Sequence, residues 1–303
     1  MSEIGRRSLG RMIWANRPLY LMLLPALIYF IVFQYIPMWG ARLAFQNFSF
    51  VGHNTWVGLK HFQTLFSSPA FPRVLGNTVI ISAMKLFINF PMPIVLALML
   101  SEVRSAGYKK VVQSVIYLPH FLSWVVITGI FFNLLSLDGG GVNRLLGLFG
   151  LRPFPFLTNT TSIRWVFVFS EMWRSIGWDS ILYVAAIIRI DGDLYEAARI
   201  DGAGMLRRIS SITLPLILPT IVTVFVLNLG YFMNAGFDQV FNMMNDAVIN
   251  SVDIIDTYVY RMGIENGNFS YATAAGLFKG IIGLVLILGT HFASKRATGK
   301  GVW

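Results

Sequence analysis

The chain has 303 residues, of which 55% are hydrophobic and only 13% charged, and its mean hydropathy is +0.64. Soluble domains carry about 25% charged residues, so this composition excludes an ordinary soluble protein and indicates a polytopic membrane protein. The absence of cysteine excludes disulfides and thiol chemistry. The formal net charge of +10 lies mainly at the ends of apolar segments, which is typical of membrane topology signals rather than of nucleic-acid binding.

The first apolar run, residues 19–39, follows several arginines but is too long for the apolar core of a signal peptide. No small-residue cleavage site follows it, so we predict a retained membrane span. Five more segments are long and apolar enough to cross the hydrocarbon core as helices: 76–101, 111–136, 165–188, 212–233 and 272–293. Prolines in the second and fifth segments predict kinks, which buried neighbours can accommodate. We therefore predict an all-α polytopic membrane protein with six transmembrane helices in a single domain, 1–303.

Lysines and arginines in the connections predict the orientation of these spans. They are twice as numerous on one side of the membrane, which holds residues 6–17, 104–110, 189–208 and 295–300. Because positively charged connections stay in the cytoplasm, we predict that both termini and the loop 189–210 are cytoplasmic. The longer connections then face outward, at residues 40–75, 137–164 and 234–271.

The connection between the fourth and fifth spans, residues 189–210, is more structured than a simple return needs. Asp193 precedes Glu196 by three residues, the spacing of a capping box, and predicts a short helix over residues 194–200. The tetrapeptide Asp201–Gly204 then interrupts the helix, because glycine readily adopts the positive φ that ends one. A second short helix is predicted just beyond it. Spacing alone leaves two interpretations open: an elbow that another protein grips, or a capped helix pair that only orders the loop.

The loop resembles the signature of permease subunits from binding-protein-dependent ABC importers. The resemblance rests on Glu196-Ala-Ala-x-x-Asp-Gly-Ala203, followed by Ile212-Thr-Leu-Pro215 and Pro219. Other blocks resemble the carbohydrate-uptake branch of the maltose-permease-like superfamily, and within it permeases for polysaccharide, aldouronate or alginate-type substrates: Phe33–Gly40, Tyr117–Trp124, Ile254–Arg261 and Ala275–Lys279. Ile209 departs from the pattern, since family members often carry an aromatic residue there. It is still apolar, so we expect docking to survive.

The resemblance implies that the loop inserts into a groove of a cytoplasmic ATPase subunit and transmits its closure to the spans. Glu196 would brace the elbow and Gly202 would permit the turn. The full set of implied coupling residues is Tyr195, Glu196, Ala197, Ala198, Asp201, Gly202 and Ala203. The implied partners are two ATP-binding subunits, a homologous second permease subunit in a heterodimer, and an extracytoplasmic solute-binding protein. The implied location is the bacterial cytoplasmic (inner) membrane.

The chain contains no Gly-x-x-x-x-Gly-Lys-[Ser/Thr] phosphate loop, so we do not expect it to hydrolyse ATP. ATP and Mg would be bound by the partner ATPase subunits, and this chain would carry no cofactor. The four histidines lack the spacing of a metal site, and no serine has an evident nucleophile setting. We therefore predict no metal site and no catalytic residues.

Five ionisable residues lie inside predicted spans, where charge is costly and by default marks a transport pathway: Lys85, Glu171, Arg174, Asp179 and Lys279. Glu171 and Arg174 are three residues apart on one helix and could simply neutralise each other. Lys85 and Lys279 have no nearby acid in sequence. Each therefore needs a partner on another helix, a water-filled cavity or a ligand.

Trp173 and Trp178 flank the charged stretch of the fourth span. Aromatic faces pack against the apolar faces of pyranose rings, although a tryptophan in a span also serves packing or the membrane interface. We hypothesise a central cavity for an oligosaccharide, in which Lys85, Arg174 and Lys279 accept uronate carboxylates. The alternative is that these cations are structural.

The main alternative function is a secondary sugar transporter driven by an ion gradient, with Glu171 and Asp179 as proton or sodium sites. Six spans without an inverted repeat, together with the docking-type loop, favour the ABC permease. The acid-rich outer loop 234–271 also has two interpretations. It is either a docking surface for the binding protein or a solvated loop on the translocated side.

Overall fold

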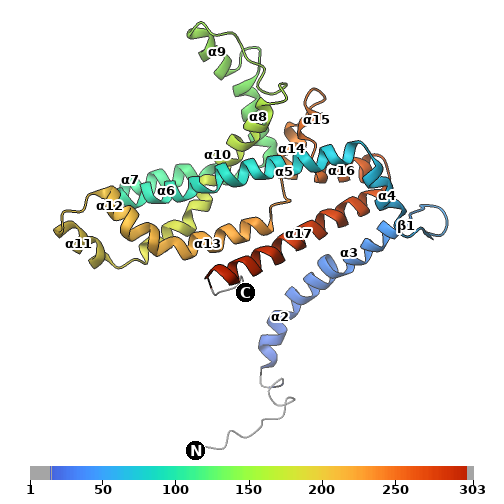
Figure 1. Cartoon of the computed structure of the whole chain (residues 1–303), viewed down its shortest axis with the longest axis horizontal. Helices are drawn as coiled ribbons and strands as arrows, with labels where there is room; N and C mark the ends of the chain where they lie inside the picture. The colour runs from blue at the N-terminus through green and yellow to red at the C-terminus, as the bar shows by residue number, and fades with distance from the viewer. Residues whose placement is uncertain (1–13, 15, 299–303) are drawn as a thin grey trace, which may run out of the picture.

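The computed structural model describes residues 14 and 16–298, and most of these residues are helical. Within this part of the chain, strands are confined to a short antiparallel ribbon of β1 (Gln46–Asn47) and β2 (Thr55–Trp56). The predicted all-α class is therefore confirmed (Figure 1). Some cations used to predict the orientation lie outside the described residues, namely Arg6, Arg7, Arg11 and Lys300.

The first two predicted spans are helical along their whole length. α2 (Arg17–Phe30) continues through α3 (Ile36–Met38) to Phe45 by way of π and 3-10 turns. α5 (Ala70–Asn89) and α6 (Pro91–Glu102) together form the second span, after the short α4 (Lys60–Ser67). The boundary between α5 and α6 falls at Phe90, because the proline that follows it has no N–H for the helical hydrogen-bond ladder.

The third predicted span, 111–136, is wrong as a single continuous helix. α7 (Ala106–Tyr117) ends in a 3-10 turn, and α8 (Trp124–Leu135) leaves it at an angle of 104°. Pro119 lies inside the turn, and the Ser123 hydroxyl accepts a hydrogen bond from the N–H of Val126 at the start of α8. Proline and a new helix cap therefore explain the bend, and α8 and α9 (Gly141–Leu148) project from the bundle (Figure 1).

The remaining predicted spans are long helices. They are α10 (Ser162–Ile188), the continuous stretch of α12 (Met205–Arg208) and α13 (Leu214–Gly230), and α17 (Phe269–Thr298). By length and composition, four helical stretches of the described chain can span a membrane, and the bent α7–α8 pair would make a fifth. α10 has 27 residues, but its three central charges make it more polar than the others. The count of six spans stays a prediction.

α10 is the central helix, because it packs against α5, α6, α7 and α13. Its closest approach to α7 occurs at Gly177, which is buried. A Cβ atom at this position would lie 2.1 Å from the carbonyl oxygen of Ile116 and 3.0 Å from the ring of Tyr117. Small residues allow such close helix contacts inside membranes.

Gly177→Ala is therefore expected to destabilise the protein by about 3 kcal/mol, the upper end for overpacking, because the group it meets is backbone and cannot rotate away. The thermal midpoint of the detergent-purified complex measures this effect. Gly129→Ala in α8 is the matched control, since nothing lies within 4 Å of a Cβ there. Equal midpoints for the two variants would contradict the close approach of α7 and α10.

The predicted outer loop, residues 234–271, contains three short α-helices. They are α14 (Phe237–Met243), α15 (Ile249–Val252) and α16 (Ile255–Tyr260). Two of its five acids are in ion pairs, Asp253 with Arg261 and Asp256 with Lys279. The interpretation of its acids as uniformly solvated is therefore wrong for these two.

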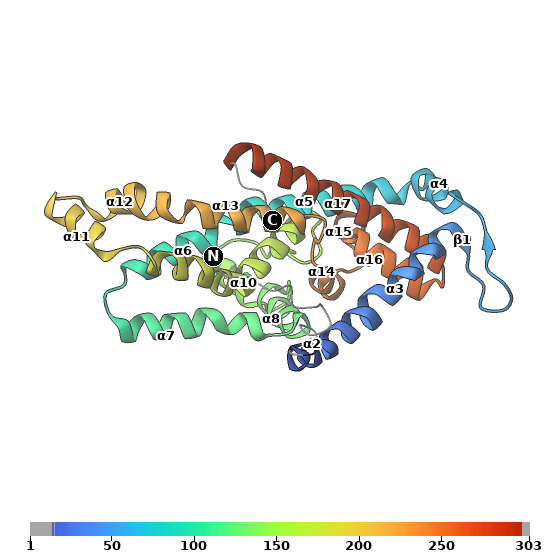
Figure 2. The same cartoon turned by 90° about the horizontal axis from the view of Figure 1, so that it is seen from below.

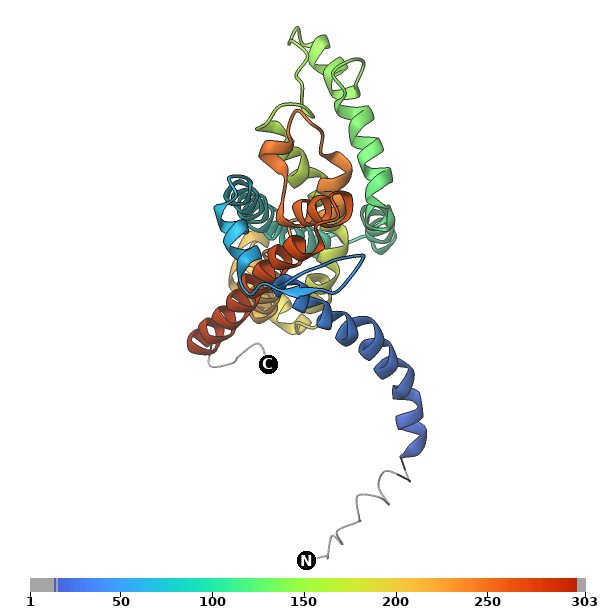
Figure 3. The same ribbon diagram turned by 90° about the vertical axis from the view of Figure 1, so that its right-hand side faces the viewer.

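The molecule is elongated, with its two kinds of loop at opposite ends. α11 (Gly192–Ile200) and α12 lie at one end, and α4 with the β ribbon lies at the other (Figure 2). This separation agrees with the predicted placement of residues 189–210 and 40–75 on opposite sides of the membrane. α2 swings away from the bundle (Figure 3), and the 17–45 stretch has no buried residue in its most apolar window.

Candidate functional site

The loop 189–210 forms two short helices joined by an elbow. α11 begins at Gly192, two residues earlier than predicted, and its cap is Asp191 rather than Asp193. The Asp191 carboxylate accepts a hydrogen bond from the N–H of Asp193 at 3.1 Å. The predicted capping residue is therefore wrong, because an acid two residues upstream already satisfies the first free N–H groups.

The elbow itself is built as the sequence predicts. Gly202 has a φ of +79°, the left-handed conformation that ends a helix. Its N–H donates to the carbonyl of Arg199 at 3.0 Å, and the N–H of Ala203 donates to the carbonyl of Ala198 at 2.8 Å. These two bonds are the pair expected when glycine terminates a helix, and α12 restarts three residues later.

The predicted coupling residues lie on the outer surface of this elbow or at its base. Four of these seven residues are exposed, and the other three, Tyr195, Ala198 and Ala203, are half-buried. Ile200 and Leu206, which were not predicted, are 86% and 80% exposed. Two large apolar side chains held in water at a folded turn are typical of a surface that another protein covers. Their signal in the sequence is an apolar residue on each side of the Asp201–Gly204 break.

Side-chain contacts tie the elbow to two spans. The Tyr195 hydroxyl lies 2.9 Å from the buried Thr213 hydroxyl at the base of α13. Arg208 donates to the carbonyl of Ala203 at 3.2 Å and forms an ion pair of 3.3 Å with Glu102 at the end of α6. These contacts connect the elbow directly to the second and fifth predicted spans.

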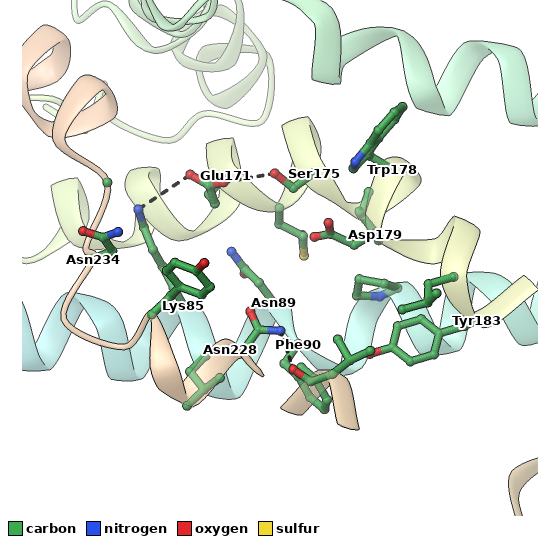
Figure 4. A pocket seen from close by; sticks show the side chains of 18 of the residues that line it. Lys85, Asn89, Phe90, Glu171, Ser175, Trp178, Asp179, Tyr183, Asn228 and Asn234 are labelled. Carbon is green, nitrogen blue, oxygen red and sulfur yellow. Dashed lines mark hydrogen bonds and ion pairs between the residues drawn. The ribbon is translucent and has the colours of Figure 1, made fainter. Parts of the chain in front are cut away.

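A cavity of about 680 Å³ lies among α5, α6, α10, α13 and the segment after α13. Its wall is mostly apolar but carries polar side chains at several levels (Figure 4). The polar and charged members are Ser82, Lys85, Asn89, Glu171, Ser175, Asp179, Asn228 and Asn234. A cavity of this size with a few converging polar groups is typical of a small-molecule site.

Lys85 is held by three oxygen acceptors in the wall of this cavity. Its Nζ donates to the carbonyl of Ala235 at 2.6 Å and to the side-chain oxygen of Gln239, and it lies 3.7 Å from Glu171. Ser175 donates to the second Glu171 oxygen at 3.0 Å. Glu171 is thus paired with Lys85, and among the described residues no ion pair joins Glu171 to Arg174.

Lys279 lies outside the cavity lining and is also fully engaged. Its Nζ lies 2.6 and 2.8 Å from the two carboxylate oxygens of Asp256 and 2.7 Å from the Asn234 side-chain oxygen. Asn234 belongs to the cavity wall. Lys85 of α5 and Lys279 of α17 therefore hold neighbouring residues of the same segment, Ala235 and Asn234.

The tryptophans of α10 have different surroundings. Trp178 lines the cavity and stacks on His120 with ring centres 4.5 Å apart and an interplanar angle of 2°. The ring centre of Trp173 lies 5.9 Å from that of Phe131, and Trp173 is not among the residues that line the cavity. The structure thus brings Lys85, Glu171, Trp178 and Asp179 into the cavity wall, while Trp173, Arg174 and Lys279 lie beside it.

Comparison with known proteins gives a consistent result. Residues 89–297 match the family model described as "Binding-protein-dependent transport system inner membrane component". The chain is 45% identical over 288 residues to the polygalacturonan/rhamnogalacturonan transport system permease protein YteP of Bacillus subtilis (strain 168), covering 94% of this chain and 90% of that protein. It is 42% identical to protein LplB of the same organism, over 94% of this chain and 91% of that protein.

Among solved structures, the chain is similar to a chain of a bacterial alginate ABC transporter in complex with an alginate pentasaccharide-bound periplasmic protein. The TM-score is 0.90 and the sequence identity 40%, over 98% of this chain and 100% of that one. A structure described as a bacterial ABC transporter involved in the import of the acidic polysaccharide alginate matches with a TM-score of 0.89 and 41% sequence identity. The match covers 96% of this chain and 99% of the chain in that structure. The chain belongs to the family of inner-membrane components of binding-protein-dependent transport systems.

Proposed function

We propose that this chain is one permease half of an ATP-driven importer that carries an acidic oligo- or polysaccharide across the bacterial cytoplasmic membrane. Several proteins to which it is similar are named for polygalacturonan, rhamnogalacturonan or alginate, all of which are acidic polymers. The cavity lined with polar groups and Trp178 supports a sugar substrate. A separate binding protein delivers the glycan, as in the complex with an alginate-bound periplasmic protein.

The observation that carries this proposal is the exposed elbow at one end of the bundle. Its turn depends on Gly202, its surface offers Ile200 and Leu206, and Arg208 and Tyr195 connect it to two spans. Such an element converts the movement of a docked protein into movement of the helices around the cavity. We propose that the docked protein is an ATPase subunit.

The proposed assembly contains two ATP-binding subunits, which hold ATP and Mg, and a second permease subunit homologous to this chain. Both termini are proposed to face the cytoplasm. Purification of the tagged chain from membranes in mild detergent tests this composition: we expect two ATPase copies and one related permease for each copy of this chain. A chain that purifies alone and transports sugar in liposomes without ATP would contradict the proposal and favour the ion-driven transporter.

Tyr195→Phe is expected to weaken the link between the elbow and the fifth span. It removes one hydrogen bond, to Thr213, worth about 1 kcal/mol, and we expect sugar uptake per ATP hydrolysed to fall about threefold. Parallel measurement of uptake and ATP hydrolysis in proteoliposomes gives this ratio. Tyr108→Phe is the matched control, because Tyr108 is exposed and its hydroxyl makes no hydrogen bond among the described residues. An unchanged ratio in Tyr195→Phe would show that this link does not transmit movement.

A further inference from the structure

An acidic glycan needs a positive partner inside the pathway, and the cavity wall does not offer a free one. The wall contains one cation, Lys85, and two carboxylates, Glu171 and Asp179. Asp179 makes no ion pair among residues 14 and 16–298, and the formal charges of the three lining residues sum to −1. Charge at membrane depth is costly unless it is matched, so a uronate carboxylate has to find its counter-charge nearby.

Two of the three cations at membrane depth are already engaged by oxygen atoms of the chain. A lysine ammonium has three N–H donors. Lys85 donates to Ala235 and Gln239 and is ion-paired with Glu171 at 3.7 Å, and Lys279 donates to Asn234 and the two oxygens of Asp256. Neither ammonium can bind a carboxylate without giving up a contact that holds the outer segment. The hypothesis that all three cations receive uronates is therefore not supported for these two.

Arg174 differs from both lysines. A guanidinium has five N–H donors, yet Arg174 makes no hydrogen bond and no ion pair within the described residues, and its Nε is buried without a partner. Its contact is with Trp124, whose ring centre lies 5.2 Å from the guanidinium carbon. A buried N–H donor without an acceptor raises the free energy of the folded protein. Binding of an acceptor group from a ligand would remove this penalty at Arg174.

An aromatic residue of the cavity wall, Trp178, lies on the same helix as Arg174. Arg174 precedes Trp178 by one helical turn, so the two side chains share a face of α10. Trp178 stacks on His120, whose Nδ1 is also buried and has no hydrogen-bond partner in the described part of the chain. In Figure 4, Trp178 stands on the cavity wall beside Asp179 and along the helix from Glu171 and Ser175. A planar charged fork beside an aromatic face matches a pyranose ring that bears a carboxylate.

We propose that Arg174 and Trp178, supported by His120, form a subsite for a uronic-acid residue of the glycan in transit. The guanidinium binds the carboxylate through two parallel N–H···O hydrogen bonds, and Trp178 contacts the sugar ring. This subsite rests on the proposed function and assigns its specificity for acidic sugars to Arg174 rather than to Lys85 or Lys279.

Direct binding to the purified permease complex tests the subsite. The probes are trigalacturonate and its trimethyl ester, which has the same rings without the negative charges. We expect Arg174→Gln to weaken trigalacturonate binding about tenfold, as expected for a lost charge-assisted pair, and to change binding of the ester less than twofold. Arg174→Lys should retain part of the affinity, since it keeps the charge but loses the fork. Arg152→Gln, in an exposed outer loop, is the matched control and should behave as wild type.

Each other outcome contradicts a specific step. Equal weakening of both probes by Arg174→Gln, or no weakening of either, overturns the carboxylate subsite. Loss of the second permease subunit from the purified Arg174→Gln complex overturns it in favour of a subunit contact. ATP-driven uptake by the wild-type complex, measured on the same preparation, separates these results from failure of the proposed function. A wild-type complex that transports with ATP but binds neither probe contradicts both the subsite and the acidic substrate.

Discussion

Replacing Gly202 by proline is expected to abolish ATP-driven sugar uptake while the protein remains in the membrane at normal abundance. Gly202 has a φ of +79°, whereas proline fixes φ near −65°, and proline also lacks the N–H that Gly202 donates to Arg199. The backbone after α11 must therefore adopt a different conformation, which changes the orientation of the exposed Ile200 and Leu206 side chains. Because the elbow is at the surface, the change costs the spans little. We expect at least a tenfold loss of uptake per molecule in the membrane.

Gly204→Ala is the matched control for this variant. Gly204 lies two residues further along, its φ is −67°, and a Cβ there would meet nothing within 4 Å. We expect wild-type uptake from this control. Uptake by vesicles, normalised to the amount of permease on an immunoblot, gives the comparison. Wild-type uptake by Gly202→Pro at normal abundance would remove the basis for assigning a coupling role to the loop.

Lys279→Gln is expected to destabilise the complex strongly and to impair transport of acidic and neutral sugars alike. The lysine neutralises Asp256, and the side chains of the pair are only 18% and 24% exposed. Removing one partner of a buried pair costs about 3–5 kcal/mol, and we expect roughly 3 kcal/mol here because the pair is partly exposed. The change should lower the thermal midpoint in detergent and release the outer segment at Asn234.

The double variant Asp256→Asn with Lys279→Gln distinguishes a structural pair from a substrate contact. Removing both charges leaves none uncompensated, so the double variant should recover most of the midpoint lost in either single variant. Lys60→Gln, at an exposed position in the outer loop 40–75, controls for loss of a lysine. If Lys279→Gln keeps the wild-type midpoint and impairs only acidic sugars, the structural role is wrong.

The sequence predicted local features better than long-range ones. The turn at Gly202 follows from the conformational freedom of one residue, and it was predicted correctly. The predicted start of α11 was two residues too late. Aspartate is a good N-cap at either position 191 or position 193, and the sequence does not say which of the two begins the helix. The third span was predicted as one continuous helix because the hydropathy of a segment does not show where its helix axis bends. Its bend depends on Pro119 and on the new cap at Ser123.

The interaction partners of the charged residues in the spans could not be predicted from one sequence. Lys85 and Lys279 were correctly expected to need partners on other elements, but their acceptors lie in the segment 234–239 and at Asp256. The spacing of Glu171 and Arg174 suggested a pair, yet Glu171 is drawn to Lys85 from another helix. Whether an i, i+3 pair forms depends on what else each side chain can reach. That competition is decided by tertiary packing, which also leaves Arg174 free of hydrogen bonds within the described chain.

The most direct test of the whole account is ATP hydrolysis by the reconstituted complex with its solute-binding protein. The account predicts that the binding protein loaded with an acidic oligosaccharide such as trigalacturonate raises ATP hydrolysis several-fold, and that labelled sugar accumulates in the vesicles only when ATP is present. In the Gly202→Pro complex the same addition should cause no rise. Sugar accumulation without ATP, or hydrolysis that is indifferent to the loaded binding protein, would contradict the account.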